Sequence, residues 1–311
     1  MVLFLFKRCL RAVVAMLICL TAVFILLRVA GDPAAILLPP ETPPAVRAEY
    51  REMWGLDRAL PEQFALYLWS ALRGDFGISL ADNQPVVAIL LEALPRTLLL
   101  GASALAIAAA VGLPLGLMAA LRHNTPIDRF VMSVAVMGYS MPVFFLGILL
   151  IFLFALSLRI LPSAGSSSAW HLIMPALTLG LPLAGRLARF ARTSALEVLG
   201  RPFIRTARAK GVSPLGVVIK HALPNAAVPM LMFLGIEIGH ILAGAAVTET
   251  IFAWPGLGRL LVESVGQRDL PVAQGVILLV TLIMVLSNLA VDLVHAALDP
   301  RIGSSEMAAG R

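Results

Sequence analysis

Long uncharged runs of apolar residues recur along the chain and are separated by short polar segments. A helix needs roughly 20 such residues to cross the hydrocarbon core of a bilayer. Hydrophobic residues make up 59% of the chain and charged residues only 14%, against roughly 25% charged residues in soluble domains. The pattern predicts an all-α, polytopic membrane protein with six transmembrane helices. These spans are expected at 12–30, 97–121, 131–156, 171–188, 226–247 and 272–294.

The fourth predicted span has the least regular sequence. Pro175, Pro182 and Gly185 interrupt it, and Arg186 shortens its apolar run. Prolines are tolerated in a span where neighbouring helices satisfy the freed carbonyl groups. We therefore keep this segment as a membrane helix.

Lys and Arg gather on one side of the six predicted spans, and short loops rich in these residues stay in the cytoplasm. They precede the first span, flank the loop after the second and fill the loop after the fourth. The segment 31–96 instead carries five Arg and nine acidic residues. This asymmetry places 31–96 outside, and both termini and the loop 186–225 in the cytoplasm. The net charge of +6 then follows from topology and does not indicate nucleic-acid binding.

The predicted spans divide the chain into regions. These are an N-terminal region with the first span (1–30), an extracytoplasmic loop (31–96), a five-helix core (97–298) that contains a cytoplasmic loop (191–225), and a cytoplasmic tail (299–311). A secretory signal is the alternative for the N-terminus, but no A-x-A cleavage pattern follows Arg28. Cys9 and Cys19 lie about 15 Å apart along one helix, so they do not pair with each other.

The outer segment contains two stretches with the pattern of amphipathic helices, 45–54 and 61–72. In the second, Phe64, Leu68, Trp69 and Leu72 recur at helical spacing. One interpretation is a cap that rests on the bilayer surface with its aromatic residues at the interface. The other is a docking surface for a partner that delivers substrate. The pattern alone leaves both open.

Motifs of known catalytic sites are missing from the sequence. It has no phosphate loop, no dinucleotide-binding glycine pattern, no H-E-x-x-H and no G-x-S-x-G. The five histidines are scattered over loops and helices. We therefore expect no enzyme activity and no cofactor in this chain.

A basic island, RTARAKGVSPLGVVIKHALP, stands between apolar segments at 205–224. Residues 192–210 favour a helix, and Gly211 ends it by permitting a left-handed cap. Ser213 and Pro214 begin a second, short helix that is expected to run to about His221. Pro224 is expected to stop it. A short helix on the cytoplasmic face suits insertion into a groove of a soluble partner.

This spacing resembles the EAA loop of ABC importer permeases. Arg205, Thr206 and Ala207 stand at the E-A-A positions, Gly211 at the glycine, and Leu223 and Pro224 at the final L-P. Arg205 replaces the consensus Glu, and His221 the consensus Ile. Further segments resemble the dipeptide, oligopeptide and nickel branch of that family: GDPA (31–34), GLDRALPEQF (55–64), GDFGISL (74–80), LPRTL (94–98), IFAWPGLGRL (251–260), RDLPV (268–272) and LDPR (298–301).

The resemblance implies a permease subunit in a bacterial-type inner membrane. Such a subunit pairs with a second homologous permease. Two cytoplasmic ABC ATPases dock on the EAA loops, and an extracytoplasmic binding protein delivers the substrate. The ATPase-docking loop would then include Arg205, Thr206, Ala207, Gly211, Ser213, Leu223 and Pro224.

Ionisable residues inside membrane spans are costly and are candidates for function. Glu237 and His240 lie three residues apart on the fifth span, and so on one helix face. They are either a packing pair at the permease interface or a polar patch on the substrate path. Asp292, near the inner end of the sixth span, is expected to be structural. Imidazole and carboxylate also suit nickel, but two ligands do not make a metal site.

The function predicted is therefore import of di- or oligopeptides, with nickel as the alternative within the family. A hypothesis of another class is a membrane receptor or scaffold whose basic loop binds anionic lipid. Such a patch needs only charge, whereas 205–224 has a glycine turn and a second helix. An intramembrane enzyme is less favoured still, because no nucleophile and base are recognisably paired.

Overall fold

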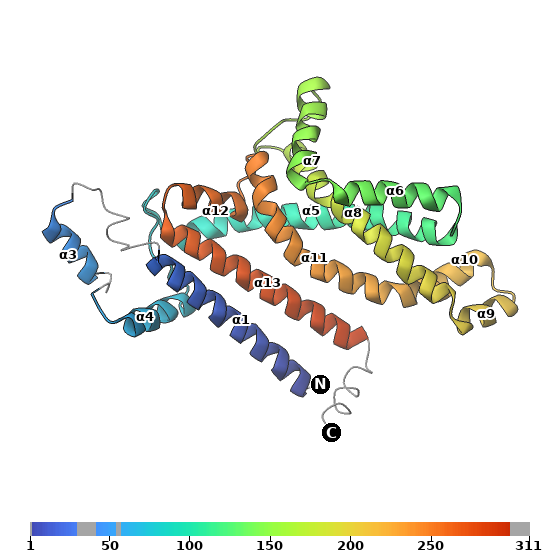
Figure 1. Ribbon diagram of the computed structural model, residues 1–311, viewed down its shortest axis with the longest axis horizontal. Coiled ribbons are helices and arrows are strands. Elements are labelled where there is room, and N and C mark those ends of the chain that lie inside the picture. Colours follow the sequence, from blue (N-terminus) through green and yellow to red (C-terminus); the bar gives the residue numbers. More distant parts are fainter. Residues whose placement is uncertain (1, 30–41, 54–56, 299–311) are drawn as a thin grey trace. The chain divides into compact units, whose positions relative to one another are not determined.

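The computed structural model describes residues 2–29, 42–53 and 57–298, and this part of the chain is almost entirely helical (Figure 1). The α-helices are α1 (Val2–Val29), α3 (Pro44–Met53), α4 (Leu60–Leu72), α5 (Val86–Leu121), α6 (Pro126–Ser140), α7 (Val143–Leu150), α8 (Trp170–Leu199), α9 (Pro202–Ala209), α10 (Pro214–Gly216), α11 (Leu223–Ile251), α12 (Leu257–Gly266) and α13 (Leu270–Leu298). Two π-helical segments, η1 (Ile151–Ser157) and η2 (Val217–Ala222), follow α7 and α10. The predicted all-α class is confirmed for the described residues.

Four helices of the described chain are long and apolar enough to cross a membrane: Val86–Leu121, Trp170–Leu199, Pro214–Leu242 and Leu270–Val291. A fifth span results if the bent pair Pro126–Ser140 and Val143–Ser157 counts as one. The apolar part of α1, Leu10–Ile25, is shorter than a membrane span. The predicted number of six is therefore not confirmed and stays a prediction. The expected tail 299–311 and the segments GDPA and LDPR lie wholly or mostly outside the described residues.

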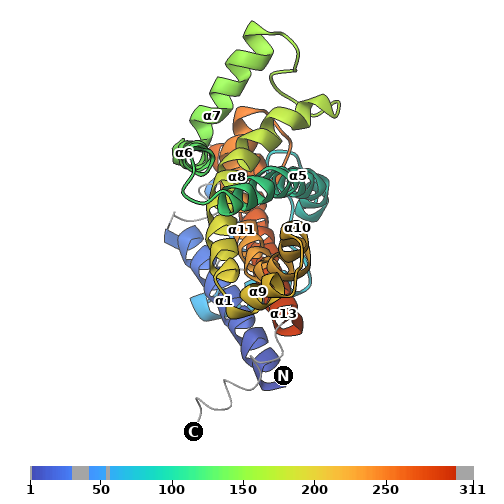
Figure 2. The same ribbon diagram turned by 90° about the vertical axis from the view of Figure 1, so that its right-hand side faces the viewer.

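The third predicted span, 131–156, is not one straight helix. Its two parts meet at an angle of 99°, and Figure 2 shows the turn between α6 and α7. The break falls at Met141 and Pro142, which both have extended backbone angles. The ring of a proline disfavours the helical conformation of the residue before it, so α6 ends at Ser140.

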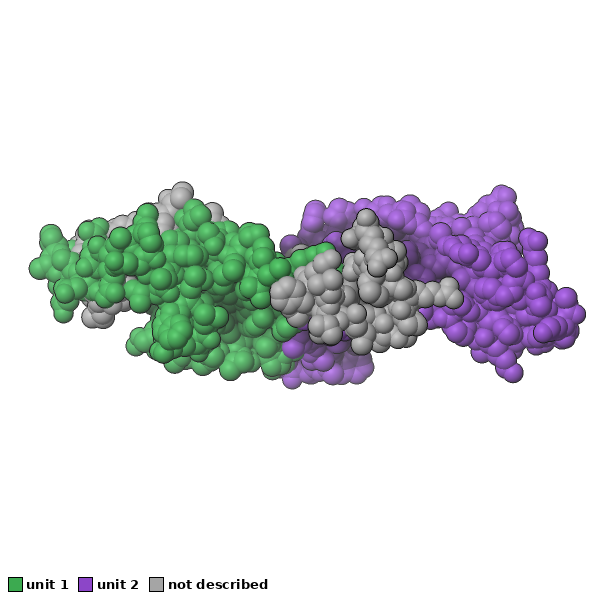
Figure 3. All heavy atoms as spheres, turned by 90° about the horizontal axis from the view of Figure 1, so that it is seen from below, with its two compact units in different colours: residues 1–96, 255–286 green, residues 97–254, 287–311 purple. Residues whose placement is uncertain are grey.

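The chain divides into two compact units, which Figure 3 colours separately. The first comprises residues 1–96 and 255–286, and the second comprises residues 97–254 and 287–311. Helices α5 and α13 contribute to both.

In the first unit, α4 packs against α1 through aromatic side chains. The ring of Phe24 lies 5.2 Å from that of Phe64 and 5.8 Å from that of Tyr67. The predicted helices 45–54 and 61–72 appear as α3 and α4, although Trp54 lies outside the described residues. Trp69 and Leu72 of α4 are exposed. Both interpretations of this segment thus stay open.

A buried carboxylate joins two distant segments of the first unit. Ser79 Oγ donates a hydrogen bond of 2.5 Å to Asp269 Oδ2, and the backbone N–H groups of Leu80 and Ala81 donate to the same oxygen. Asp269 and Ser79 are each 2% exposed. Because the other oxygen of Asp269 accepts from the backbone N–H of Val272, the residue also caps the start of α13. These contacts give the segments GDFGISL and RDLPV a structural role.

Helix α8 lies at the centre of the second unit and packs against α6, α7 and α11. Small residues let these helices approach closely. A Cβ atom on Gly116 of α5 would lie 2.4 Å from the backbone oxygen of Ala188, and one on Gly185 would lie 2.5 Å from that of Ala135. Small residues at such crossings are typical of helix packing in membranes.

Candidate functional site

The predicted docking loop forms a helical hairpin between α8 and α11. Pro202 begins α9, which ends at Ala209, and Gly211 then adopts a φ of +79°. Ser213 caps the next helix, since its hydroxyl accepts a hydrogen bond of 3.2 Å from the backbone N–H of Gly216. The glycine turn and the serine cap thus lie where the sequence predicts them.

A small apolar core holds this hairpin together. Ile204 and Val217 are 0% and 1% exposed, and Ala207 and Ala222 are also buried. Val198 and Leu199 at the end of α8 pack against them. Ala207 therefore points into the hairpin, whereas Arg205 and Thr206 lie on its surface. Because burial fixes these contacts, the hairpin is a folded unit rather than a loose loop.

The outer surface of the hairpin combines apolar and basic side chains. Leu215 is 68% exposed, Ile219 53% and Phe203 42%. The exposed basic residues are Arg205, Arg208, Lys210 and Lys220. Exposed apolar residues rimmed by charge are typical of a protein-binding surface.

Two details of the predicted hairpin are wrong. The helix expected over 192–210 is interrupted, because α8 continues to Leu199 and the chain turns at Gly200 and Arg201 before α9. Pro224 does not stop the second helix. It lies with Leu223 in the first turn of α11, and α10, η2 and α11 continue from one into the next. Proline is accepted there because the N–H groups of a first turn need no intrahelical partner.

The two polar residues of the fifth span have different surroundings. Glu237 is 3% exposed, and its Oε2 lies 2.6 Å from a terminal nitrogen of Arg186 on α8. His240 Nδ1 lies 3.6 Å from the same oxygen, but the His240 side chain is 67% exposed. Sequence reasoning recognised Glu237 and His240 as a pair on one face. It missed the partner Arg186, which is 51 positions away from Glu237 and enters the prediction only as the charge that shortens the fourth span and begins the basic loop.

A second buried carboxylate on α11, Glu249, was also missed. It is 0% exposed, and its Oε1 accepts a hydrogen bond of 2.7 Å from Thr97 Oγ1. The predicted fifth span ends at 247, two residues before Glu249. In the structure α11 runs on to Ile251. The adjoining motif IFAWPGLG was the sequence signal that could have drawn attention to this end of the helix.

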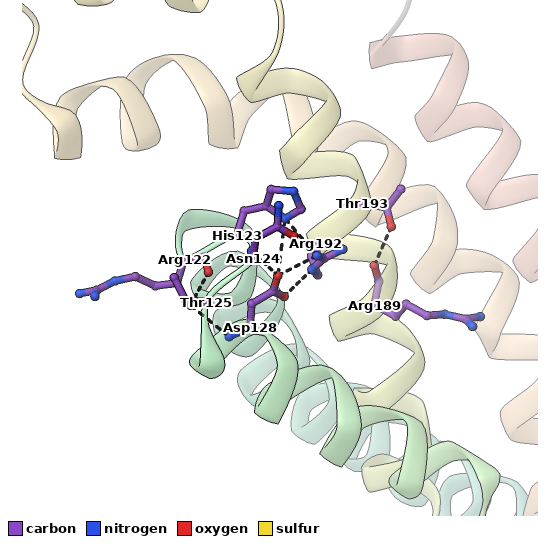
Figure 4. Close-up of polar contacts among 8 residues, drawn as sticks. All are labelled: Arg122, His123, Asn124, Thr125, Asp128, Arg189, Arg192 and Thr193. Atoms are coloured by element: carbon purple, nitrogen blue, oxygen red, sulfur yellow. Dashed lines mark hydrogen bonds and ion pairs between the residues drawn. The ribbon is translucent and has the colours of Figure 1, made fainter.

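A further polar cluster joins the turn before α6 to α8 (Figure 4). Arg192 donates two hydrogen bonds to the carboxylate of Asp128, from Nε at 2.6 Å and from a terminal nitrogen at 2.8 Å. The same terminal nitrogen lies 3.1 Å from His123 Nδ1. The backbone N–H of Asn124 donates to Asp128 at 2.9 Å. Thr125 caps α6 through the backbone N–H of Asp128. Asp128 itself is 3% exposed. The cluster fixes the end of α8 that leads into the hairpin.

Residues that could hold a metal ion are not gathered in the part of the chain that the structure describes. No group of three or more His, Cys, Asp or Glu side chains occurs there. Glu237 and His240 thus have an arginine, rather than a third ligand, beside them.

Two family descriptions match the chain. Residues 112–304 match the family described as binding-protein-dependent transport system inner membrane component. Residues 1–101 match the N-terminal region of such membrane components.

The chain is similar along most of its length to permease proteins of glutathione transport systems. It is 42% identical to GsiC of Escherichia coli K12 over 272 residues, which is 88% of this chain and 89% of that protein. It is 42% identical to GsiC of Salmonella paratyphi A over 297 residues, which is 95% of this chain and 97% of that protein.

Solved structures share the fold at lower identity. The chain is similar to one in the inward-facing MetNI methionine ABC transporter, with a TM-score of 0.59, 23% identity and coverage of 68% of this chain and 96% of that one. A chain of an amino acid ABC transporter with histidines gives a TM-score of 0.54 at 19% identity, over 68% of this chain and 94% of that one.

Proposed function

Since this chain belongs to the family of inner-membrane components of binding-protein-dependent transport systems, we propose that the substrate it helps to import is a short peptide. The chain is a permease subunit of an ABC importer, and ATP hydrolysis belongs to a separate subunit. The observation that carries the proposal is the 42% identity to glutathione permeases over 88–95% of the chain. Because glutathione is a tripeptide, a path for short peptides is the simplest property that this chain would share with those permeases.

Nickel import has weaker support. A transition-metal path would be favoured by imidazole and carboxylate groups that converge. In the described part of the chain, Glu237 is instead paired with Arg186 at 2.6 Å. A guanidinium is never a metal ligand at neutral pH, because it keeps its proton. We therefore favour the peptide over the metal.

The helical hairpin is proposed as the surface on which an ATPase subunit docks. Its apolar core preforms the shape, and Leu215 and Ile219 provide exposed apolar side chains between basic ones. Gly211 permits the tight turn at a φ of +79°. A lipid-binding patch would need the charges but not this shape. The proposal also places the hairpin and both termini in the cytoplasm, as the distribution of Lys and Arg favours.

We propose different roles for Glu237 and His240 in a complex with a second homologous permease. The ion pair of Glu237 with Arg186 joins α11 to α8, so Glu237 stabilises the helix packing. His240 is 67% exposed on α11, among mostly apolar residues of the predicted fifth span. An exposed polar side chain at membrane depth needs a polar partner or water. We place His240 on the face that meets the second permease or the substrate path.

Uptake assays on the whole transporter test the proposal. Cells that lack their own peptide importers, and that express this permease with its partner subunits, should take up labelled glutathione or dipeptide but not nickel. Nickel uptake without peptide uptake would refute the peptide assignment. Within this system, Glu237→Gln should lower the amount of assembled complex. His240→Ala should change the apparent affinity for substrate and spare assembly if His240 lines the substrate path, and should lower assembly if it meets the second permease.

A further inference from the structure

A small cavity lies in the first unit, where the start of α5 meets α12. Its volume is about 240 Å³. It is lined by Ile89, Glu92, Ala93, Pro255, Gly256, Arg259, Leu260 and Glu263. The lining residues recur at three- and four-residue spacing, so each helix presents one face to the cavity.

The cavity has an apolar floor and a charged rim. Ile89, Ala93 and Leu260 belong to the apolar cluster that joins α5, α12 and α13. Glu92, Arg259 and Glu263 are the charged residues of the lining. Arg259 Nε lies 2.6 Å from Glu263 Oε1, and this pair cancels one charge of each sign. The carboxylate of Glu92 remains, so the cavity has a net negative charge.

The cavity stands beyond the bilayer rather than within it. Helix α5 has 36 residues and is therefore about 54 Å long, while the hydrocarbon core is about 30 Å thick. The excess belongs to the start of the helix, where Glu92 and Arg96 interrupt the apolar run. In the proposed orientation this end lies outside, on the side from which substrate arrives.

These properties select the chemistry of a ligand. Ligand sites are typically 300–1,000 Å³, so a cavity of about 240 Å³ takes one end of a peptide rather than the whole molecule. An ammonium group offers three hydrogen-bond donors and no acceptor, which suits two carboxylates at one rim. The apolar floor suits the side chain of the first residue. A carboxyl terminus would meet the net negative charge.

We propose that this cavity binds the amino-terminal residue of the incoming peptide, with its ammonium group at Glu92 and Glu263. This inference rests on the proposed peptide function. It adds a binding site in the permease itself, on the outer end of α5. Glu92 supplies the deciding charge, because Glu263 shares its own with Arg259.

Substrate protection of a reporter cysteine tests the site directly. The reporter is Ile89→Cys, with Leu260→Cys as a second one, in a transporter whose Cys9 and Cys19 are replaced by Ser. The purified complex in nanodiscs is labelled with a thiol reagent in the presence of dialanine or N-acetyl-dialanine. Dialanine should slow labelling by up to about fivefold, the effect of one partly exposed ion pair. The acetylated peptide should not slow it.

Two variants separate the pocket from a general effect of charge. Glu92→Gln should abolish the protection by dialanine. The matched control Glu62→Gln, an exposed glutamate of α4 outside the cavity, should preserve it. Equal protection by both peptides, or protection that survives Glu92→Gln, would overturn the proposal. So would the absence of protection at both reporters.

The two proposals fail in different ways. If the intact transporter takes up no peptide in cells, the proposed function fails whatever the labelling shows. If peptide is taken up but dialanine gives no protection at either reporter, only the cavity assignment fails.

Discussion

Replacing Asp128 by Asn removes the charge at the centre of the cluster between the turn before α6 and α8. The side chain keeps its size, so the change tests electrostatics rather than packing. Arg192 loses its ion pair at 2.6 Å and 2.8 Å and keeps one neutral hydrogen bond to the amide oxygen of the new side chain, beside the contact of 3.1 Å with His123. The backbone N–H of Asn124 loses a charged acceptor.

The expected cost lies between two limits. Breaking a fully buried pair costs about 3–5 kcal/mol, and breaking an exposed one costs about 0.2–1 kcal/mol. Asp128 has only 4% of its side chain exposed, but Arg192 has 23% and is reached by water. We therefore expect a loss of about 2 kcal/mol in the free energy of unfolding. For a unit of this size, that corresponds to a fall of about 4–8 °C in Tm.

Thermal unfolding of the purified complex, followed by tryptophan fluorescence, measures this loss. The matched control is Glu197→Gln on α8, which breaks an exposed ion pair with Arg201 in the turn after that helix and should cost less than about 0.5 kcal/mol. A double-mutant cycle with Arg192→Gln should give a coupling of about 1–2 kcal/mol. If Asp128→Asn and the control lower Tm equally, the cluster does not stabilise the fold as argued.

Three further experiments test other parts of the structure. Gly211→Val should cost about 1 kcal/mol or more because of the φ of +79°, and should reduce uptake while the protein still reaches the membrane, as immunoblots and transport assays on the same cells would report. In intact cells, an impermeant thiol reagent should label Asp82→Cys but not Leu215→Cys; the reverse pattern would invert the orientation. Ser79 is unsuitable as the outer probe, because its side chain is buried against Asp269. Gly116→Val should prevent stable expression, since its first side-chain atom alone would lie 2.4 Å from a backbone oxygen of α8, and normal yield would contradict that packing.

Apolar windows were sufficient to locate the long helices but not their ends. The predicted span 97–121 is the C-terminal part of α5, which begins at Val86. Glu92 and Arg96 interrupt the uncharged apolar run, but a helix can continue through charged residues where it leaves the bilayer. For the same reason α11 extends to Ile251 and includes Glu249, beyond the predicted end at 247.

Residues paired across the sequence were harder to predict. The cap at Ser213 and the turn at Gly211 depend on neighbours in sequence, and both were placed correctly. Arg186 and Glu237 belong to different helices, and helical spacing pairs Glu237 only with His240 of its own helix. Because proline breaks helix interiors, the sequence predicts that the second helix of the hairpin stops at Pro224. Its position in a first turn, after a π segment, depends on the whole hairpin and is not encoded in the spacing.

The continuity of α10, η2 and α11 makes the hairpin one end of a long stiff rod. Glu237 lies 23 residues after Pro214, which is about 35 Å along a helix. A tilt of about 10° around the hairpin end would displace the backbone at Glu237 by about 6 Å, a little more than one helical turn of 5.4 Å. A force on the hairpin would thus displace Glu237 by about this distance, because α10, η2 and α11 follow one another without an intervening loop. Such a movement would either carry Arg186 of α8 along with Glu237 or break the ion pair between them.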